Sequence, residues 1–188
     1  MRARSLLPYA VAVVAIIAVV AAIELWLGRV PICTCGSIKL WHGVVQSAEN
    51  SQHITDWYTF SHVIHGLGFY WLLWLVARRW PVAVRLVAAT LIEGAWEVVE
   101  NTPLIIDRYR AATIALDYYG DSILNSTSDI AAMLLGFWIA SRVPVWASIV
   151  IAVVFELFVG MMIRDNLALN IIMLLYPIEA IKQWQGGA

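Results

Sequence analysis

Glutamates and histidines stand inside long apolar runs of this 188-residue chain, where an ionisable side chain requires a physical reason. Glu93, Glu97 and Glu100 are spaced four and three residues apart, so a helix would place all three carboxylates on one face. His62 and His65, three residues apart, would also share a face. Because a carboxylate at membrane depth costs about 2.5–3.5 kcal/mol on insertion scales, these residues are candidate functional groups.

A third polar stripe leads into another apolar run. If the chain is helical from near residue 121, Asp121, Asn125 and Asp129 share one face. Glu156 and Asn170, in two later runs, fall at a similar depth. We therefore expect helices that are distant in the sequence to converge on one polar cavity. Its predicted members, taken as the catalytic candidates, are His62, His65, Glu97, Glu100 and Asp129.

Two kinds of chemistry fit this set of side chains. Histidine with glutamate and aspartate is a suitable ligand set for zinc or another divalent metal ion, although the HExxH zinc motif is not present. The same residues suit a proton relay, because histidine titrates near neutrality and a buried carboxyl group can hold a proton there. A simpler alternative is that these residues hydrogen-bond neighbouring helices and only fix the bundle.

The depths of the three glutamates suggest how their charges divide. Two neighbouring carboxylates in a low-dielectric site resist full ionisation unless a cation compensates them. Glu93 lies deepest, so we expect it to be the protonated, structural member. Glu97 is then expected to be ionised and paired with His62, His65 or a bound cation.

The first long predicted loop, residues 28–56, contains both cysteines and two further histidines. For Cys33 and Cys35 the sequence leaves three states open, namely a strained disulfide, capture of a soft metal ion and two inert thiols. His42 and His53 are predicted to be solvated.

The second long predicted loop, residues 103–125, is amphipathic and suited to lie over the cavity. Arg108 and Arg110 in this loop are the cations placed to neutralise the negative charge of Glu97 and Glu100. They are the predicted substrate-binding residues, because the same guanidinium groups would hold an anionic headgroup.

The composition places the chain in a membrane. Hydrophobic residues make up 62% of the sequence and charged residues 13%, and the mean hydropathy is +0.78. A soluble domain has about twice that share of charged residues, and one of this size could not bury so much apolar surface. Ordinary cytosolic, fibrous and disordered proteins are therefore excluded. The net charge of −1 offers no basic field, so nucleic acid is not an expected partner.

Six apolar runs are long enough to cross about 30 Å of hydrocarbon. We therefore predict an all-α, polytopic transmembrane bundle that forms a single domain over residues 1–188. The predicted spans are residues 6–27, 57–77, 81–102, 126–141, 145–163 and 166–184, with Pro177 kinking the last one.

The distribution of arginine orients this predicted bundle. With the N-terminus in the cytoplasm, Arg78 and Arg79 occupy one short cytoplasmic turn and Arg142 occupies another. The two long loops then lie in the periplasm, and the polar cavity opens on that side. The predicted location is the bacterial inner membrane.

Three stretches of the sequence resemble a family of uncharacterised inner-membrane proteins of alphaproteobacteria. They are WYTFSHVIHGLGFYWLLW, EGAWEVVEN and YYGDSILNSTSDI, and the resemblance covers essentially the whole chain. It implies an inner-membrane protein and carries no assigned activity.

Residues 56–140 are more distantly similar to the VanZ-like membrane proteins, which are linked to glycopeptide-antibiotic resistance. The residues that match their pattern in order are Asp56 with His62, Glu97 with Glu100, Arg108 or Arg110, and Asp129 with Gly136. The chain departs from the pattern at three points: no lysine follows Asp56, Glu100 stands where glutamine is usual, and Met133 replaces an asparagine. The similarity implies a shared polar site rather than a shared reaction.

The function predicted from these features is the handling or processing of a cell-envelope lipid or a lipid-linked anionic substrate. Membrane lipid is then the expected partner. An alternative is a non-enzymatic accessory or assembly subunit, whose partner would be another membrane protein. A small proton-coupled transporter is disfavoured, because no inverted repeat is visible in the sequence.

Overall fold

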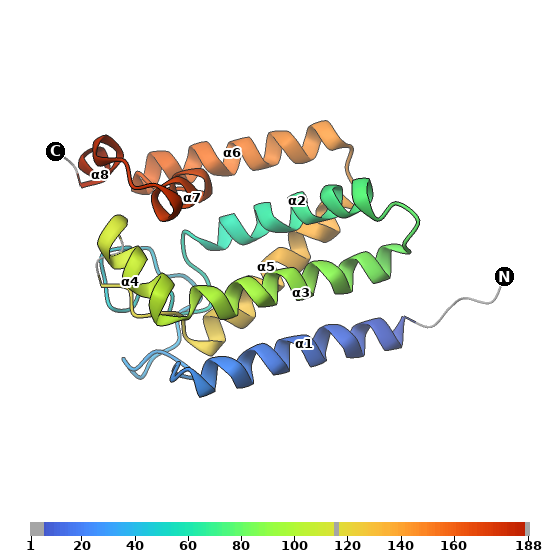
Figure 1. Cartoon of the computed structure of the whole chain (residues 1–188), viewed down its shortest axis with the longest axis horizontal. Helices are drawn as coiled ribbons and strands as arrows, with labels where there is room; N and C mark the ends of the chain where they lie inside the picture. The colour runs from blue at the N-terminus through green and yellow to red at the C-terminus, as the bar shows by residue number, and fades with distance from the viewer. Residues whose placement is uncertain (1–5, 115–116, 187–188) are drawn as a thin grey trace.

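The computed structural model describes residues 6–114 and 117–186, and this part of the chain forms an all-α fold of eight helices (Figure 1). The helices are α1 (Leu7–Trp26), α2 (Thr59–Val76), α3 (Val82–Glu100), α4 (Pro103–Ala112), α5 (Ile123–Ala140), α6 (Val145–Ile163), α7 (Leu167–Leu175) and α8 (Glu179–Gly186).

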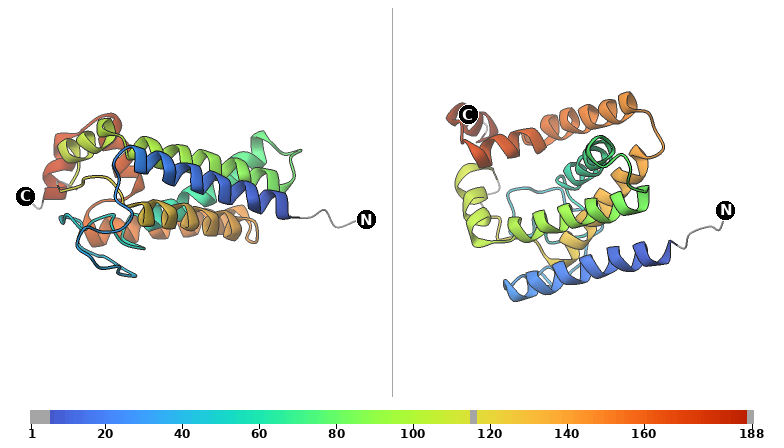
Figure 2. Two further views of the ribbon diagram at one scale, coloured as in Figure 1. Left: turned by 90° about the horizontal axis from the view of Figure 1, so that it is seen from below. Right: turned by 45° about the vertical axis from the view of Figure 1, so that its right-hand side comes forward.

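Five long helices, α1, α2, α3, α5 and α6, run along the length of the molecule, and the three short helices gather at one end (Figures 1 and 2). We call this end, with the connections 27–58 and 101–122, the loop end. The opposite end, where residues 77–81 and 141–144 make short turns, is the turn end. The predicted polar cavity is expected near the loop end, because the predicted polar residues lie in the halves of their helices that face it.

Four of the long helices, α1, α2, α5 and α6, are long and apolar enough to cross a membrane. They correspond to the first, second, fourth and fifth predicted spans, and α6 has the predicted bounds. The third predicted span is also one helix, α3. It carries Arg85 and three glutamates, so its composition is more polar than that of the other four.

The sixth predicted span, residues 166–184, is wrong as a single helix. The chain leaves helical geometry at Tyr176, and Pro177 follows. Proline has no backbone N–H and disfavours helical geometry in the residue before it. The nine-residue α7 reaches only about 14 Å at 1.5 Å per residue, and so it cannot cross the hydrocarbon layer.

The contact between α2 and α5 is made at glycines. A Cβ atom on Gly66 would lie 2.0 Å from the carbonyl oxygen of Met133, and one on Gly136 would lie 2.1 Å from that of Val63. Only glycine permits two helix backbones to approach so closely. This contact fixes the distance between α2 and α5, and with it the position of the histidine-bearing face of α2.

An apolar core fills the bundle beside the polar cluster. Its buried members come from four helices: Val20, Leu73, Ala89, Ile130, Met133 and Phe137. Side chains with branched or aromatic shapes pack here without polar partners.

The loop 27–58 is bonded to the beginning of α5. The backbone N–H groups of Ser122, Ile123 and Leu124 donate to the carbonyl oxygens of Ser51, Val30 and Pro31. These three bonds satisfy N–H groups at a helix start, which have no partner inside the helix. They also hold the loop against the polar residues of α5.

Candidate functional site

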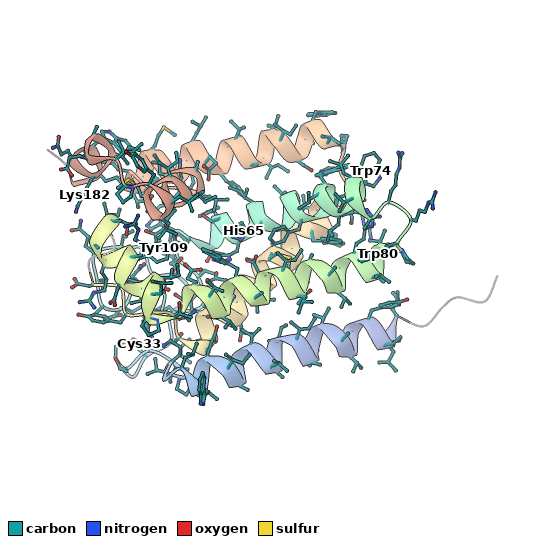
Figure 3. All side chains as sticks on the ribbon, viewed as in Figure 1. Cys33, His65, Trp74, Trp80, Tyr109 and Lys182 are labelled. Atoms are coloured by element: carbon teal, nitrogen blue, oxygen red, sulfur yellow. A yellow bond between two sulfur atoms is a disulfide. The ribbon has the colours of Figure 1, made fainter. Side chains whose placement is uncertain are left out.

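The centre of the site is Glu93, whose carboxylate lies between two histidines. The Nδ1 atom of His62 is 2.6 Å from Glu93 Oε1, and Nδ1 of His65 is 3.0 Å from Glu93 Oε2. Glu93 is fully buried and His62 is 6% exposed. Figure 3 shows His65 projecting from α2 into the space between α2 and α3. The two histidines of α2 therefore face a glutamate of α3, as the helical spacing of these residues predicted.

Glu97 and Asp129 lie on either side of the His62 ring. Glu97 Oε1 is 3.4 Å from His62 Nδ1, and Asp129 Oδ2 is 3.8 Å from His62 Nε2. Thr59 donates its hydroxyl to Asp129 at 3.3 Å. Glu100, one turn beyond Glu97 on α3, has an oxygen that comes within 4.8 Å of ligand atoms of both His62 and Glu97. The structure therefore brings the five predicted catalytic candidates to one place, together with Glu93.

The nearest carboxylate to the two histidines is Glu93 rather than Glu97. Glu93, expected to be the protonated, structural member, is the carboxylate to which both histidines bond. Glu97, expected to be ionised and paired, is in ion-pair range of His62 at 3.4 Å, but its buried oxygens have no hydrogen-bond partner within the described part of the chain. The reason is the register of α2 against α3, which sets His62 and His65 level with residue 93.

Asp121 lies just before α5 instead of inside it, because Ser122 caps this helix by accepting from the N–H of Asn125. The Asp121 carboxylate accepts from Asn101 Nδ2 at 2.8 Å and from the hydroxyl of Tyr118 at 3.0 Å. Burial raises the pKa of Asp121 to about 6, against the opposite effect of these two hydrogen bonds. The predicted third stripe is therefore present, with its first member in the loop.

The two predicted substrate-binding arginines do not face the carboxylates. Arg108 donates through Nε to the carbonyl oxygen of Leu174 at 2.9 Å. Arg110 lies over the ring of Tyr119 and 3.9 Å from Asp107. The buried face of the short helix α4 is formed by Ile106, Tyr109 and Ala112, and neither arginine belongs to it. Their assignment as ligands of an anionic headgroup stays a prediction, which no contact among residues 6–114 and 117–186 supports.

A cavity of about 390 Å³ opens beside the cluster. Its lining includes the polar side chains of His62, His65 and Glu100, and also apolar side chains of α3 and α7 such as Ile92 and Ile171. Its full lining is Tyr58, Ser61, His62, His65, Phe69, Ile92, Trp96, Glu100, Tyr109, Leu167, Asn170, Ile171 and Leu174. A volume of this size is within the range of small-molecule sites.

A smaller polar chamber of about 30 Å³ adjoins the cluster on the side of the loop end. Tyr58, His62, Glu100 and Tyr109 line both spaces. This volume is enough for one or two water molecules, and the remaining lining is polar or aromatic. The lining residues of the chamber that the cavity does not share are Asn50, Ser51, Tyr118, Asp121 and Asp129. The cluster is thus placed between a mainly apolar cavity and a small polar chamber.

Glu156 has a structural position at the loop end. Its two carboxylate oxygens accept from the backbone N–H groups of Leu167 and Ala168, each at 3.0 Å. A carboxylate at a helix start accepts hydrogen bonds from the unpaired N–H groups, and its negative charge interacts favourably with the helix dipole. Glu156 therefore positions α7, which forms one wall of the cavity, and is not part of the predicted cavity itself.

Asp165 ties the C-terminal helices to α2. It accepts from the hydroxyl of Tyr58 at 3.0 Å, from Asn170 Nδ2 at 2.7 Å and from Gln185 Nε2 at 3.0 Å. Burial raises the pKa of Asp165 to about 7, and the hydrogen bonds act in the opposite direction. Asn170 lies on the cavity wall, as its depth in the sequence predicted.

The first loop is more ordered around its histidines than predicted. Cys33 and Cys35 form a disulfide, one of the three states that the sequence leaves open. His42 and His53, expected to be solvated, are both buried, and His53 bonds to Glu49 at 3.0 Å. Hydrogen bonds from Lys39 and His53 lower the pKa of Glu49 to about 2. Glu49 thus joins Lys39 and His53, two distant positions of the loop. The loop folds back on itself through these contacts, and this folding buries the histidines.

Comparisons with known proteins match this chain over most of its length. A family model described as a protein of unknown function (DUF2585) covers residues 24–187. The chain belongs to this family. The UPF0314 protein of Paracoccus denitrificans is 64% identical over 163 residues, which is 87% of this chain and 84% of that protein. The UPF0314 protein of Sinorhizobium fredii is 55% identical over 186 residues, 99% of this chain and 94% of that protein.

The DUF2585 match confirms the predicted uncharacterised family with relatives in alphaproteobacteria, and the UPF0314 protein of Novosphingobium aromaticivorans, 55% identical over 173 residues, extends it. No solved structure matches the chain. The distant similarity to VanZ-like proteins stays a prediction.

Several site residues of this DUF2585 member were not predicted from the sequence. Tyr58 and Tyr109 line both the cavity and the chamber, and Tyr118 lines the chamber. Tyrosine presents an apolar ring as well as a hydroxyl, so its type alone did not mark these positions as polar. Glu24, fully buried at the loop end of α1, has Ser126 of α5 and Arg29 as polar neighbours. The same test that singled out Glu93, a carboxylate inside a predicted span, could have found Glu24.

Three groups of described side chains could hold a metal ion. One is His62, His65 and Glu93, and a second is His62, Glu97 and Glu100. The third lies in the first loop and consists of Cys33, Cys35, Glu49 and His53. In the third group both thiols are consumed by the disulfide. The first two share His62, so they form one continuous donor set inside the bundle.

Proposed function

We propose that the protein binds a membrane amphiphile in the 390 Å³ cavity and presents the polar head of this molecule to the buried histidine and carboxylate cluster for processing. The single observation that carries this proposal is the composition of the cavity walls. The lining combines His62, His65 and Glu100 with hydrocarbon side chains such as Ile92 and Ile171. A cavity with both kinds of side chain fits a molecule with one polar and one apolar part.

The apolar part of the lining also reaches the surface of the bundle. Ile92 of α3 is 41% exposed and Ile171 of α7 is 48% exposed. In a membrane, this surface would face acyl chains. A lipid could therefore enter sideways, keeping its chains among apolar side chains while its head moves toward His65.

The charge of the site limits which heads it can bind. Glu93, Glu97, Glu100 and Asp129 are opposed by two histidines, and within residues 6–114 and 117–186 no lysine or arginine forms an ion pair with them. An anionic head would be repelled unless a cation or protons neutralised part of this charge. The site thus favours a neutral or cationic head, or an anionic head bridged by a metal ion.

Transport across the membrane fits the arrangement less well. On the side away from the loop end, α2 and α5 are closed by buried apolar residues such as Leu73, Met133 and Phe137. A polar substrate or a proton needs polar groups or water along its path. An accessory subunit remains the alternative, and the experiment below distinguishes it.

For the orientation, we propose that α3 crosses the membrane together with α1, α2, α5 and α6, and that the loop end faces the periplasm of the inner membrane. Support comes from Arg78, Arg79 and Arg142, which lie in the two short turns of the turn end. Reporter fusions after residues 79 and 142 should then read cytoplasmic, and fusions within 36–50 and 108–120 periplasmic. A periplasmic signal at residue 79 would overturn the orientation.

The proposed function is tested by lipid mass spectrometry on the full chain purified in a mild detergent. We expect one class of lipid to co-purify in near-stoichiometric amount. Ile171→Trp should lower that amount at least tenfold, because the larger ring fills the cavity.

Ile172→Trp is the matched control, since this neighbouring isoleucine is 40% exposed and does not line the cavity. It should retain the lipid. Equal retention in both variants, or a protein partner that co-purifies without lipid, would favour the accessory-subunit alternative.

A further inference from the structure

We propose that His62, His65, Glu93 and Glu97 bind one divalent transition-metal ion, of the kind represented by Zn²⁺, inside the bundle. This inference goes beyond the proposed function and does not depend on it. Neutral imidazoles and carboxylates together are donors that zinc accepts, most often in a tetrahedral arrangement.

The distances between the donor atoms suit such an ion. Ligands about 2.05 Å from a tetrahedral ion lie about 3.3 Å from one another. The His62 and His65 Nδ1 atoms are 2.6 Å and 3.2 Å from Glu93 Oε1, and Glu97 Oε1 is 3.4 Å from His62 Nδ1. His62, His65 and Glu93 already offer ligand atoms that all lie within 4.8 Å of one another, and lengthening the shortest contact by about 0.7 Å would bring it to this spacing. Glu97, which contacts His62, would turn toward these three atoms as the fourth ligand.

The unsatisfied carboxylate of Glu97 is a second, independent observation. Glu97 is fully buried, and neither of its oxygens has a hydrogen-bond partner in the described part of the chain. Buried polar atoms are nearly always paired, and an unpaired buried carboxylate is among the most costly groups in a protein. A bound cation next to His62 would supply the missing partner.

The surroundings of His62 also resemble those of a metal ligand. Its Nε2 atom faces Asp129 Oδ2 at 3.8 Å, and Asp129 itself accepts from Thr59. Histidine ligands usually direct their second ring nitrogen toward a carboxylate, which orients the ring and strengthens the ligand. The metal-binding tautomer, with the proton on Nε2, would turn that N–H toward Asp129.

The proposed ion would lie beside the large cavity, since His62 and His65 line it. A molecule in the cavity could then reach the ion directly. The ion would also offset the negative charge that otherwise repels an anionic head.

The metal content of the full chain tests this inference. The protein, carrying a tag without histidines, is purified in mild detergent, stripped with a chelator and titrated with Zn²⁺. We expect one zinc per chain by elemental analysis. Glu93→Gln should lower the affinity for zinc at least 100-fold, and Glu97→Gln at least tenfold, because each substitution removes an anionic ligand.

His53→Gln is the matched control, because this histidine is buried in the first loop and bonds to a glutamate, Glu49, as the site histidines do. It should still bind one zinc per chain. Loss of zinc in His53→Gln but not in Glu93→Gln would place the metal in the loop and overturn the inference.

X-ray absorption at the zinc edge of the wild-type protein keeps the inference falsifiable if the variants fail to fold. The expected first shell holds only nitrogen and oxygen, with two imidazoles. Sulfur in this shell, or less than about 0.2 zinc per chain after titration, refutes the site. Lipid mass spectrometry on the metal-free protein is scored separately, so a negative metal result and a negative lipid result are distinguishable.

Discussion

The two faces of α2 meet their neighbours in opposite ways. Toward α5, Gly66 brings backbone against backbone with no room for a Cβ atom. Toward α3, His62 and His65 are held by the carboxylate of Glu93, and a cavity of about 390 Å³ remains next to them. A single helix thus combines a close apolar contact with a wide polar one.

The contrast between the two faces of α2 explains how a small bundle can keep a cavity open. The close contact with α5 fixes the position of α2 by steric exclusion. Such a contact needs no charged groups and leaves no space for an added atom. Because α2 cannot move away from α3 without separating from or overlapping α5, the imidazoles stay in reach of Glu93. The close contact therefore preorganises the polar one.

The greatest loss of stability is expected from a substitution in the apolar contact between α2 and α5. Gly66→Ala places a Cβ atom 2.0 Å from the carbonyl oxygen of Met133, and backbone cannot yield cheaply. We expect a loss of about 3 kcal/mol or more in unfolding free energy, or loss of folded protein. Gly68→Ala is the control on the same helix, since nothing lies within 4 Å of its Cβ position. Its change should stay within about 1 kcal/mol. Similar melting of both variants in detergent would refute the close contact.

The second prediction compares the contributions to stability of two glutamates that lie one helical turn apart on the polar face of α3. Glu93→Gln weakens charged hydrogen bonds to two histidines, and we expect a cost of about 2 kcal/mol. Glu97→Gln in metal-free protein should be neutral or stabilising, because it removes a buried carboxylate that has no hydrogen-bond partner in the described part of the chain. Thermal melting of chelator-treated protein measures both. If Glu97→Gln costs as much as Glu93→Gln, the assignment of the histidine partner fails.

A third test uses pH at the contact between α2 and the C-terminal helices. The pKa of Asp165 is raised from 3.8 to about 7, so the folded state holds this proton more tightly than the unfolded state. Its contribution to stability is fully present below about pH 4 and is lost as pH rises to about 7. The melting temperature of the wild type should therefore fall more steeply between pH 4.5 and 7.5 than that of Asp165→Asn. Parallel slopes would show that Asp165 does not titrate in this range.

The smallest effect is expected outside the polar face. Arg110→Ala removes a half-exposed guanidinium that lies over Tyr119 and near Asp107. Exposed pairs of this kind contribute about 0–1 kcal/mol, and lipid co-purification should be unchanged. A marked loss of bound lipid would return Arg110 to the site and extend the polar face to α4.

The long helices could be predicted from the sequence because hydropathy and length decide them locally. Residues 145–163 form α6 with the predicted bounds, and the three glutamates of α3 share a face because a helix turns by 100° per residue. The sixth span failed for a reason that is also local, since Tyr176 and Pro177 end α7 after nine residues. Apolar composition alone did not reveal that break.

The gathering of His62, Glu97 and Asp129 at the loop end follows from the sequence alone, because the order of the helices places these residues at one depth. Only the tertiary structure decided which carboxylate meets the histidines, since a shift of one helical turn between α2 and α3 exchanges Glu93 for Glu97. It also decided that Tyr109, instead of Arg108, faces the cavity, because the rotation of α4 about its axis is set by packing against its neighbours. Helical spacing is a property of the chain, whereas register and rotation are properties of contacts between segments that the sequence separates.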